Sequence, residues 1–254
     1  MQPPKKYFIV SGVFNAARYI RRCIEAVNDQ VIDGFEVTHV IIDDGSTDAT
    51  AATIAKAPQV PHIKRHVITH PRNLGSVDAQ LAGFAYAQNN GHDHDVIIQL
   101  DGDDWFCTDE AIKTVHDTYV ETGCGATYGD WVGTYGGKSN CRQPNWSNLH
   151  EDLRSNGWCF SHLRTFRTGY TRHLDVEDFK DPTRGGAFFN AAYDAVVCLP
   201  IFEFAGKDKV VWIRTPLIYY NQENPLAEAR LRLNDQNHCA FASYDKKMRA
   251  PINI

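Results

Sequence analysis

The chain has 254 residues, which suits one large α/β domain or two closely packed halves. Hydrophobic residues make up 43% and charged residues 22%, which is ordinary globular usage, and the net charge of −5 excludes a general attraction to nucleic acid or to an anionic membrane. No apolar run reaches the roughly 20 residues that cross a bilayer, and the one near the N-terminus is too short for a signal peptide. The seven cysteines are scattered, which argues against a disulfide framework or a zinc site and predicts a cytoplasmic protein.

Four short apolar runs in the first hundred residues predict strands. They are residues 7–10, 35–42, 63–69 and 96–100. The segments between them carry apolar residues at helical spacing, for example Ile20, Cys23, Ile24 and Val27. This alternation of strand and helix predicts an α/β fold with a mostly parallel sheet flanked by helices.

The second half of the chain is less regular. Apolar spacing predicts a helix through Ile112, Val115 and Tyr119. Further candidates are strands at 126–132 and 210–220 and a helix at 190–205. Residues 136–157 are rich in Gly, Asn and Ser and predict a loop, and the polar residues from about 221 suggest a lid or a tail.

Polar residues follow three of the predicted strands directly. They are Ser11-Gly12, Asp43-Asp44 and residues 101–104, which read DGDD. In parallel sheets ligands bind beyond the carboxyl ends of the strands. We therefore expect these three strand ends to form one binding site.

The acidic run after the fourth strand has the chemistry of a cation site. Asp101 and Asp103 alternate, a spacing at which two carboxylates can share one hard divalent ion directly or through water. The alternative is a solvated acidic turn that caps a helix near Asp109. The Asp-x-Asp pattern alone does not separate the two interpretations.

The second strand end has two interpretations as well. Asp43 and Asp44 can accept hydrogen bonds from a nucleobase N–H or a ribose hydroxyl, or they can form a turn and a helix cap. Phe14, which follows the first strand, can stack on a base or belong to the core.

Four segments resemble, in order, the motifs of family 2 glycosyltransferases. They are residues 10–23 (VSGVFNAARYIRRC), 42–48 (IDDGSTD), 73–83 (NLGSVDAQLAG) and 100–105 (LDGDDW). The match covers roughly the first 110 residues and is far more specific than any single motif. Proteins of that family have the GT-A fold, use nucleotide-sugar donors and invert the anomeric configuration, and the resemblance implies the same here.

The resemblance also implies which residues bind the donor. They are Gly12, Phe14, Asp43, Asp44, Arg72, Asn73, Asp101 and Asp103. The first four would contact the nucleoside, the next two would lie near the base or phosphates, and the last two would hold Mn²⁺ or Mg²⁺. The chain departs from the family pattern at Gly12, where Pro is usual, and at Gln80, where Arg is frequent. Arg72 or an arginine of the second half would then make the diphosphate contact.

Transfer with inversion needs a general base that takes the proton of the acceptor hydroxyl. By resemblance this base is an Asp at the start of a helix in the second half, and Asp194 fits that place. The alternative for Asp194 is a surface carboxylate on a helix. Asp178 and Glu177, which precede a Gly-Gly pair, are the second choice for the base.

The segment 158–167 (WCFSHLRTFR) packs aromatic, His and Arg residues into a short span. Its His-Leu-Arg-Thr-Phe run resembles a subset of family 2 enzymes that includes bacterial and phage members. We expect Trp105, His162, Arg164 and Arg167 to bind the acceptor, with His162 as a possible metal ligand. The alternative is an amphipathic helix whose Leu163 and Phe166 face the core. Three further tryptophans are candidates for a carbohydrate groove: Trp131, Trp146 and Trp158.

These observations lead to one function hypothesis with two alternatives. Residues 1–105 would bind a nucleotide-sugar, with UDP as the default because Asp43 and Asp44 can meet the uracil N3–H, and residues 106–254 would bind a saccharide or glycoconjugate acceptor. In the first alternative the acceptor is a hydroxymethylated base of phage DNA, for which Arg164, Arg167, Arg172 and His173 would supply positive charge. In the second the chain binds nucleotide-sugars without catalysis.

Overall fold

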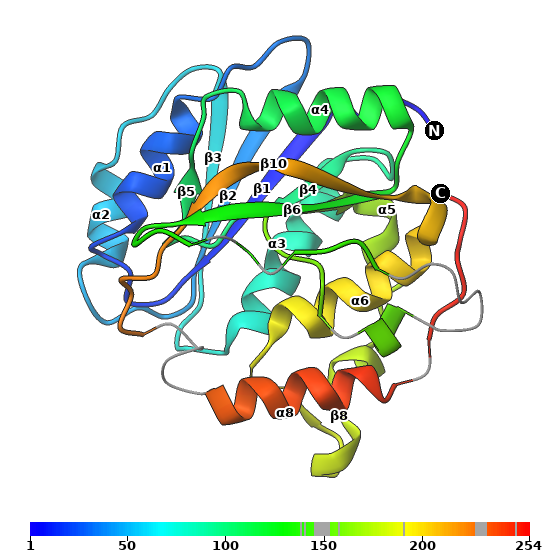
Figure 1. Ribbon diagram of the computed structural model, residues 1–254. Helices are drawn as coiled ribbons and strands as arrows, with labels where there is room; N and C mark the ends of the chain where they lie inside the picture. The colour runs from blue at the N-terminus through cyan, green and yellow to red at the C-terminus, as the bar shows by residue number, and fades with distance from the viewer. Residues whose placement is uncertain are drawn as a thin grey trace.

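A computed structural model gives the structure of the protein (Figure 1). It describes residues 1–137, 139, 141–144, 153–156, 158–189, 191–226, 233–246 and 248–254. Trp146, one of the predicted carbohydrate contacts, lies outside these residues.

The described elements alternate strand and helix in the first half of the chain. The strands are β1 (Lys6–Val13), β2 (Glu36–Asp43), β3 (Ile63–Thr69), β4 (Val96–Gln99), β5 (Trp105–Phe106), β6 (Ala126–Gly133), β7 (Arg164–Arg167), β8 (Lys180–Asp181), β9 (Ala187–Phe188) and β10 (Val210–Tyr220). The α-helices are α1 (Ile20–Asn28), α2 (Thr50–Lys56), α3 (Ser76–Asn90), α4 (Ala111–Thr122), α5 (Thr168–Thr171), α6 (Tyr193–Ala205) and α8 (Leu233–Tyr244). Short 3₁₀ helices are η1 (Leu153–Asn156), η2 (Val176–Phe179), η3 (Pro182–Arg184) and η4 (Lys207–Lys209).

One eight-stranded mixed sheet forms the centre of the molecule, in the order β3-β2-β1-β4-β7-β6-β10-β5. The first four of these strands are mutually parallel, and β7 runs antiparallel to both β4 and β6. The expected parallel sheet of the first half is therefore confirmed, and the second half extends it through an antiparallel strand.

Side chains alternate between the two faces of the sheet. In β1, Phe8 and Val10 join the core under α3 and α6, whereas Tyr7 and Ile9 join the core under α1 and α4. Helices therefore cover both faces, as Figure 1 shows. A central sheet buried on both faces explains why its strands appear in the sequence as short continuous apolar runs.

A glycine allows α3 to lie close to the sheet. A Cβ at Gly83 would lie 2.3 Å from Cγ1 of Val10, which is too short for any real contact. The third predicted motif therefore contains a packing requirement, because the middle of α3 must come close to β1 and β2.

Among the elements of the second half that the sequence did not predict are β7 and α8. Residues 164–167 form the central strand β7, not the amphipathic helix considered as the alternative for this segment. The region from about 221 was expected to be a lid or a tail, and its described part contains α8, which packs against α6. The predicted helix at 190–205 begins at Tyr193. None of the described helices is long and apolar enough to span a membrane.

Candidate active site

The three polar strand ends lie side by side at the carboxyl edge of the sheet. The backbone N–H of Asp44, after β2, donates to the carbonyl of Val13 in β1 at 2.8 Å. The backbone N–H of Gly102, after β4, donates to the carbonyl of Gly12 at 3.3 Å. A Cβ at Gly102 would lie 1.9 Å from Cγ1 of Val13, so only glycine fits where the acidic turn crosses β1.

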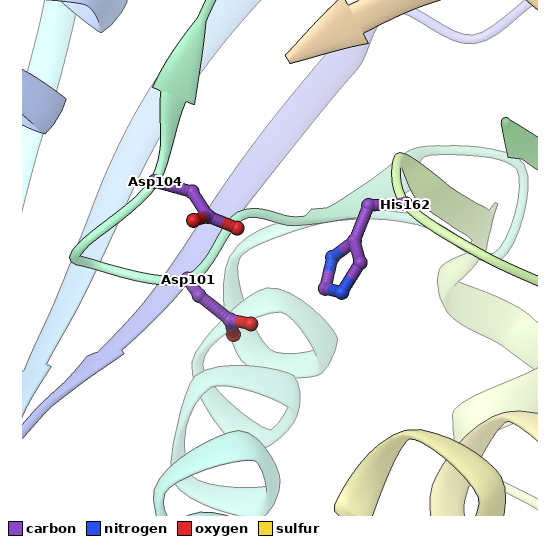
Figure 2. A group of neighbouring side chains, drawn as sticks. All are labelled: Asp101, Asp104 and His162. Carbon is purple, nitrogen blue, oxygen red and sulfur yellow. The ribbon is translucent and has the colours of Figure 1, made fainter. Parts of the chain in front are cut away.

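Two carboxylates of the acidic turn face an imidazole from a distant part of the chain. Ligand atoms of Asp101, Asp104 and His162 all lie within 4.8 Å of one another. In Figure 2 the His162 ring points toward both carboxylates. Among the described residues, neither Oδ2 of Asp104 nor Nδ1 of His162 has a hydrogen-bond partner, although both atoms are buried. Buried polar atoms without partners, converging on one point, fit a divalent cation with oxygen and nitrogen ligands.

Asp103 lies in the same turn but outside this group of three. Its Oδ2 accepts a hydrogen bond of 2.7 Å from the side-chain amide of Asn224. The backbone N–H of Asn221 donates to Oδ1 of Asp104 at 2.8 Å. The segment 221–224 therefore lies against the acidic turn, and the predicted Asp101–Asp103 pair stays a prediction.

Burial raises the pKa values of all three aspartates. Burial, only partly offset by the nearby Arg164, raises the pKa of Asp101 to about 6. Burial and the carboxylates of Asp103 and Asp101 raise the pKa of Asp104 well above its ordinary value, and burial also raises that of Asp103. Burial, followed by the positive Arg164, lowers the pKa of His162 well below its ordinary value. A cation here would reverse the effect on the carboxylates and would bind a neutral imidazole.

The carboxylate of Asp44, which follows β2, holds the loop that follows β3. Asp44 accepts hydrogen bonds from Nδ1 of His70 at 2.7 Å and from the backbone N–H groups of Leu74 and Gly75 at 3.0 and 2.8 Å. A Cβ at Gly45 would lie 2.3 Å from the carbonyl carbon of Arg72. Asp44 therefore fixes the loop that carries Arg72 and Asn73, and this hydrogen bonding accounts for its burial without a ligand.

The other predicted nucleoside contacts lie at the rim of the same edge. Asp43 is buried and accepts from the backbone N–H of Ser46 at 3.0 Å. Phe14 is 39% exposed, which leaves a ring face accessible to a base. Arg72 and Asn73 are exposed. The expected residues are thus brought to one edge, with an open aromatic ring and two open polar side chains.

Asp194 lies in the first turn of α6, as expected, and its side chain is 23% exposed. Its Oδ2 lies 3.8 Å from Nη1 of Arg164. The preceding residue, Tyr193, donates its hydroxyl hydrogen to Oδ1 of Asp101. The start of α6 therefore connects the predicted base to the acidic turn, and Tyr193 is a contact that sequence reasoning missed, although it directly precedes the predicted base.

The second choices for the base are engaged elsewhere. Asp178 accepts from the backbone N–H of Asp175, the N-cap of η2, and pairs with Arg249 at 2.5 Å, and Glu177 pairs with Lys180 at 2.5 Å. Both line a cavity of about 590 Å³ formed by η2, the β8–β9 turn and the C-terminal residues. These contacts favour a structural role for both carboxylates.

All four predicted acceptor contacts are buried, His162 among them at 9% exposure, and for the other three the predicted role needs correction. Trp105 is 6% exposed, and the guanidinium of Arg22 covers its ring at 3.7 Å from the centroid. Arg164 and Arg167 are 1% and 0% exposed at opposite ends of β7. Arg167 donates to the carbonyls of Cys124, Gln2 and His94, each at 2.9 Å. Residues without exposed surface cannot form the open face of an acceptor groove.

The remaining aromatic candidates are partly accessible. Trp131 lies 4.9 Å from Tyr220, measured between ring centroids, and Tyr220 in turn lies 5.6 Å from His162. Trp158 packs edge-on against Phe160. Trp131 and Trp158 are half-buried, so each keeps some ring surface for a ligand.

Comparison with known proteins gives a consistent picture. The family model described as glycosyl transferase family 2 matches residues 8–192. Among curated proteins, glycosyltransferase GlyA of Streptococcus pneumoniae is 24% identical over 119 residues, and the putative glycosyltransferase EpsH of Bacillus subtilis is 28% identical over 120 residues. Each alignment covers 46% of this chain, but only 15% of GlyA and 32% of EpsH.

Solved structures share the fold at low sequence identity. TarS of S. aureus, residues 1–349 in complex with UDP, superposes with a TM-score of 0.62 at 17% identity over 87% of this chain and 61% of that chain. The mannosyltransferase PcManGT of Pyrobaculum calidifontis, in complex with GDP-Man and Mn²⁺, gives 0.60 at 16% identity over 98% and 67%. The mixed sheet flanked by helices is thus the GT-A fold, and the chain belongs to glycosyl transferase family 2.

Proposed function

We propose that the chain is an inverting glycosyltransferase that moves a sugar from a nucleotide-diphosphate sugar to a hydroxyl group of a saccharide or glycoconjugate. The observation that carries this proposal is the group of Asp101, Asp104 and His162, which has two buried atoms without partners at the carboxyl edge of the sheet. Binding sites for nucleotides occur at this edge of open α/β sheets. The open side chains of Phe14, Arg72 and Asn73 would bind the nucleotide.

The donor half would depend on Mn²⁺ or Mg²⁺. When bound, such an ion would stabilise the negative charge of the diphosphate leaving group. The geometry favours Asp101, Asp104 and His162 as its ligands, and the pair predicted from the sequence, Asp101 with Asp103, is the alternative. Asp103 would become available if Asn224 released its carboxylate.

The acceptor half would use Asp194 as the general base. Its carboxylate would take the proton from the acceptor hydroxyl while that oxygen forms a bond to the anomeric carbon. The bond from the anomeric carbon to the diphosphate breaks on the opposite face, so the configuration inverts and the nucleoside diphosphate leaves. The partial exposure of Asp194 supports this role, because a base must be reachable by the acceptor.

UDP is the nucleotide that we propose for the donor. Asp43 lies at the end of β2, where a carboxylate could accept from the uracil N3–H. TarS has been solved with UDP and with UDP-GlcNAc, whereas PcManGT has been solved with GDP-Man. Residues 1–105 would bind this donor, and residues 106–254 would form the acceptor side.

The structure gives no support to a DNA acceptor. Arg164 and Arg167 are buried, and Arg172 pairs with Asp93 at 2.7 Å. Of these three arginines only Arg172 is exposed, and its charge is paired with that of Asp93, so they do not form the broad positive face that phosphate backbones require.

The test is release of nucleoside diphosphate from a panel of UDP-, GDP- and TDP-linked sugars, with and without Mn²⁺. We expect slow release with water as the acceptor, dependent on Mn²⁺ and abolished in Asp104→Asn. A non-catalytic binding module would be stabilised by a nucleotide-sugar yet release no product. Release that persists unchanged with excess chelator would contradict the metal-dependent mechanism.

A further inference from the structure

Arg164 occupies an unusual place between the two carboxylates that the proposed mechanism uses. Its guanidinium is almost completely buried, at 1% exposure. Nη2 donates to the hydroxyl oxygen of Tyr193 at 3.3 Å, and Nη1 lies 3.8 Å from Oδ2 of Asp194. One cation thus contacts two consecutive residues at the start of α6.

The direction of the hydrogen bonds around Arg164 is fixed by chemistry. A guanidinium can only donate, so the Tyr193 oxygen must accept from it. The Tyr193 hydroxyl hydrogen is then free to donate to Oδ1 of Asp101, which is the contact observed. Arg164 therefore controls the orientation of the Tyr193 hydroxyl, and through it that of one donor-side carboxylate.

The Nε side of the Arg164 guanidinium is held by residues of the sheet and of two helices. Nε of Arg164 donates to Oε1 of Gln99 at 3.4 Å, and the Gln99 amide donates to Oε1 of Gln80 at 3.2 Å. Gln99 also accepts from the thiol of Cys198 in α6 at 3.0 Å. Strands β4 and β7 and helices α3 and α6 thereby fix the guanidinium plane before any ligand arrives.

Arg164 is not fully paired by the described residues. A buried cation is costly unless it is fully paired, yet Nη1 of Arg164 makes no hydrogen bond to any described residue. The carboxylate beside this nitrogen is that of the predicted base, 3.8 Å away and beyond hydrogen-bond distance. A methionine or leucine would fill the same volume at lower cost.

Building on the proposed function, we propose that Arg164 is a positioning residue that holds Asp194 by charge and Asp101 through the Tyr193 hydroxyl. The two carboxylates come from different halves of the chain and must act on opposite sides of one anomeric carbon. A single rigid cation that contacts both sets the distance between the donor side and the base. Arg164 itself does not touch the reacting atoms in this assignment.

The chain offers a matched control three residues along the same strand. Arg167 is equally buried and also keeps one nitrogen, Nη2, without a partner among the described residues, but its hydrogen bonds go to backbone carbonyls at the opposite end of β7. Arg164→Lys and Arg167→Lys each keep the charge and lose the planar fork. A purely structural role predicts similar consequences for both variants.

The experiment measures Mn²⁺-dependent turnover of the donor sugar that wild type uses best, together with melting temperature and the dissociation constant for UDP. For Arg164→Met we expect kcat to fall about 100-fold, as misplacement of reacting groups by about 1 Å does, with the dissociation constant for UDP changed little. Arg164→Lys should recover part of the loss. Tyr193→Phe should also lower kcat. In the double variant, Tyr193→Phe should lower kcat by less than it does in wild type, because Arg164→Met has already removed the contact between the two side chains.

Arg167→Lys should lower the melting temperature and leave kcat near that of wild type. The inference is overturned if kcat in the Arg164 variants falls only in step with melting temperature, or if Arg164→Met keeps wild-type kcat. If wild type itself neither binds UDP nor turns over any donor, the proposed function fails first and this inference with it. If wild type is active and Arg164→Met is equally active, only the role of Arg164 is contradicted.

Discussion

The two ends of the strand pair β4–β7 carry similar side chains in different states. At one end, Asp95 accepts hydrogen bonds from the backbone N–H groups of Lys5, Lys6 and His92, and Arg167 donates to three carbonyls. At the other end, Asp104 and Arg164 each keep a buried atom without a hydrogen bond. The first end holds the fold together through these contacts, although Nη2 of Arg167 also lacks a hydrogen-bond partner among the described residues. At the second end the partnerless atoms of Asp104 and His162 belong to one group with Asp101.

This contrast gives a practical criterion for the site. Buried charge occurs at both ends, so burial does not distinguish a structural residue from a ligand-binding one. Atoms without hydrogen-bond partners also occur at both ends, but those of Asp104 and His162 belong to a group of ligand atoms within 4.8 Å of one another, which is what a cation site requires. The predictions for Asp194, Asp104 and Phe14 each compare a residue of the carboxyl edge with one that lies elsewhere in the fold.

The largest expected effect belongs to the proposed base. Asp194→Asn should lower kcat by about 1,000-fold, since a positioned general base contributes on the order of 10² to 10⁴. Calorimetry should find UDP binding close to that of wild type. The control is Asp178→Asn, which loses part of its pairing with Arg249 and should lower the melting temperature while turnover persists. Full activity in Asp194→Asn would move the role to Asp178 or Glu177.

The second prediction compares the two ends of β4 directly. Asp104→Asn should lower Mn²⁺-dependent turnover at least about 100-fold, because loss of a metal ligand removes several kcal/mol of charge stabilisation. The same change should not destabilise the fold, since it relieves repulsion among Asp101, Asp103 and Asp104. Chemical denaturation in the absence of metal measures this.

Asp95→Ala should show the reverse behaviour. It leaves three backbone donors without their carboxylate, which costs on the order of 1–3 kcal/mol of unfolding free energy. Turnover below the melting temperature should match wild type. If Asp104→Asn and Asp95→Ala both lost activity in proportion to their loss of stability, the distinction between the two ends of β4 would be wrong.

A pH effect on stability is expected from a buried histidine of β2. His39 is fully buried against Ser11, and burial lowers the pKa of its imidazole from 6.5 to about 3. Because the folded-state pKa lies below that of the unfolded chain, protonation favours unfolding, and stability falls as the pH drops from 6.5 toward 3. The slope is about 1.4 kcal/mol per pH unit. Chemical denaturation between pH 7 and 5 should show that the unfolding free energy of His39→Gln depends on pH less steeply than that of wild type, by about this amount. An equal dependence in the two proteins would contradict the lowered pKa of His39.

The smallest expected effect concerns nucleotide stacking. Phe14→Ala should weaken UDP binding about fivefold, which corresponds to about 1 kcal/mol for a lost aromatic contact. Phe241→Ala, which removes a more exposed ring in α8, should leave UDP binding unchanged. Equal effects of the two variants would remove Phe14 from the nucleoside site.

The sequence predicted the donor-side half of the fold well for a physical reason. Strands β1 to β4 are buried on both faces and separated by helices, so each forms a local apolar run followed by a polar turn. Asp43, Asp44 and Asp101 could therefore be placed at one edge. The pattern could not show that the Asp44 carboxylate is occupied by the loop at 70–75, because that loop arrives from another motif.

The acceptor side was less predictable because its contacts are non-local. Strand β7 has an arginine at each end, and only its antiparallel pairing with β4 places Arg164 at the site and Arg167 away from it. Helix α8 buries few side chains, among them Cys239, Ala242 and Ser243, so its apolar pattern is weak. His162 was named as a possible metal ligand, but only the fold brings it to Asp101 and Asp104.

The most direct test of the account is a thermal-shift titration of UDP with and without Mn²⁺, in wild type, Asp104→Asn and Asp95→Asn. We expect Mn²⁺ and UDP together to raise the wild-type melting temperature by more than the sum of their separate effects, because the ion would contact both the diphosphate and the Asp101–Asp104–His162 group. The synergy should persist in Asp95→Asn and vanish in Asp104→Asn. A wild type that no nucleoside diphosphate stabilises, with or without Mn²⁺, would contradict the central claim.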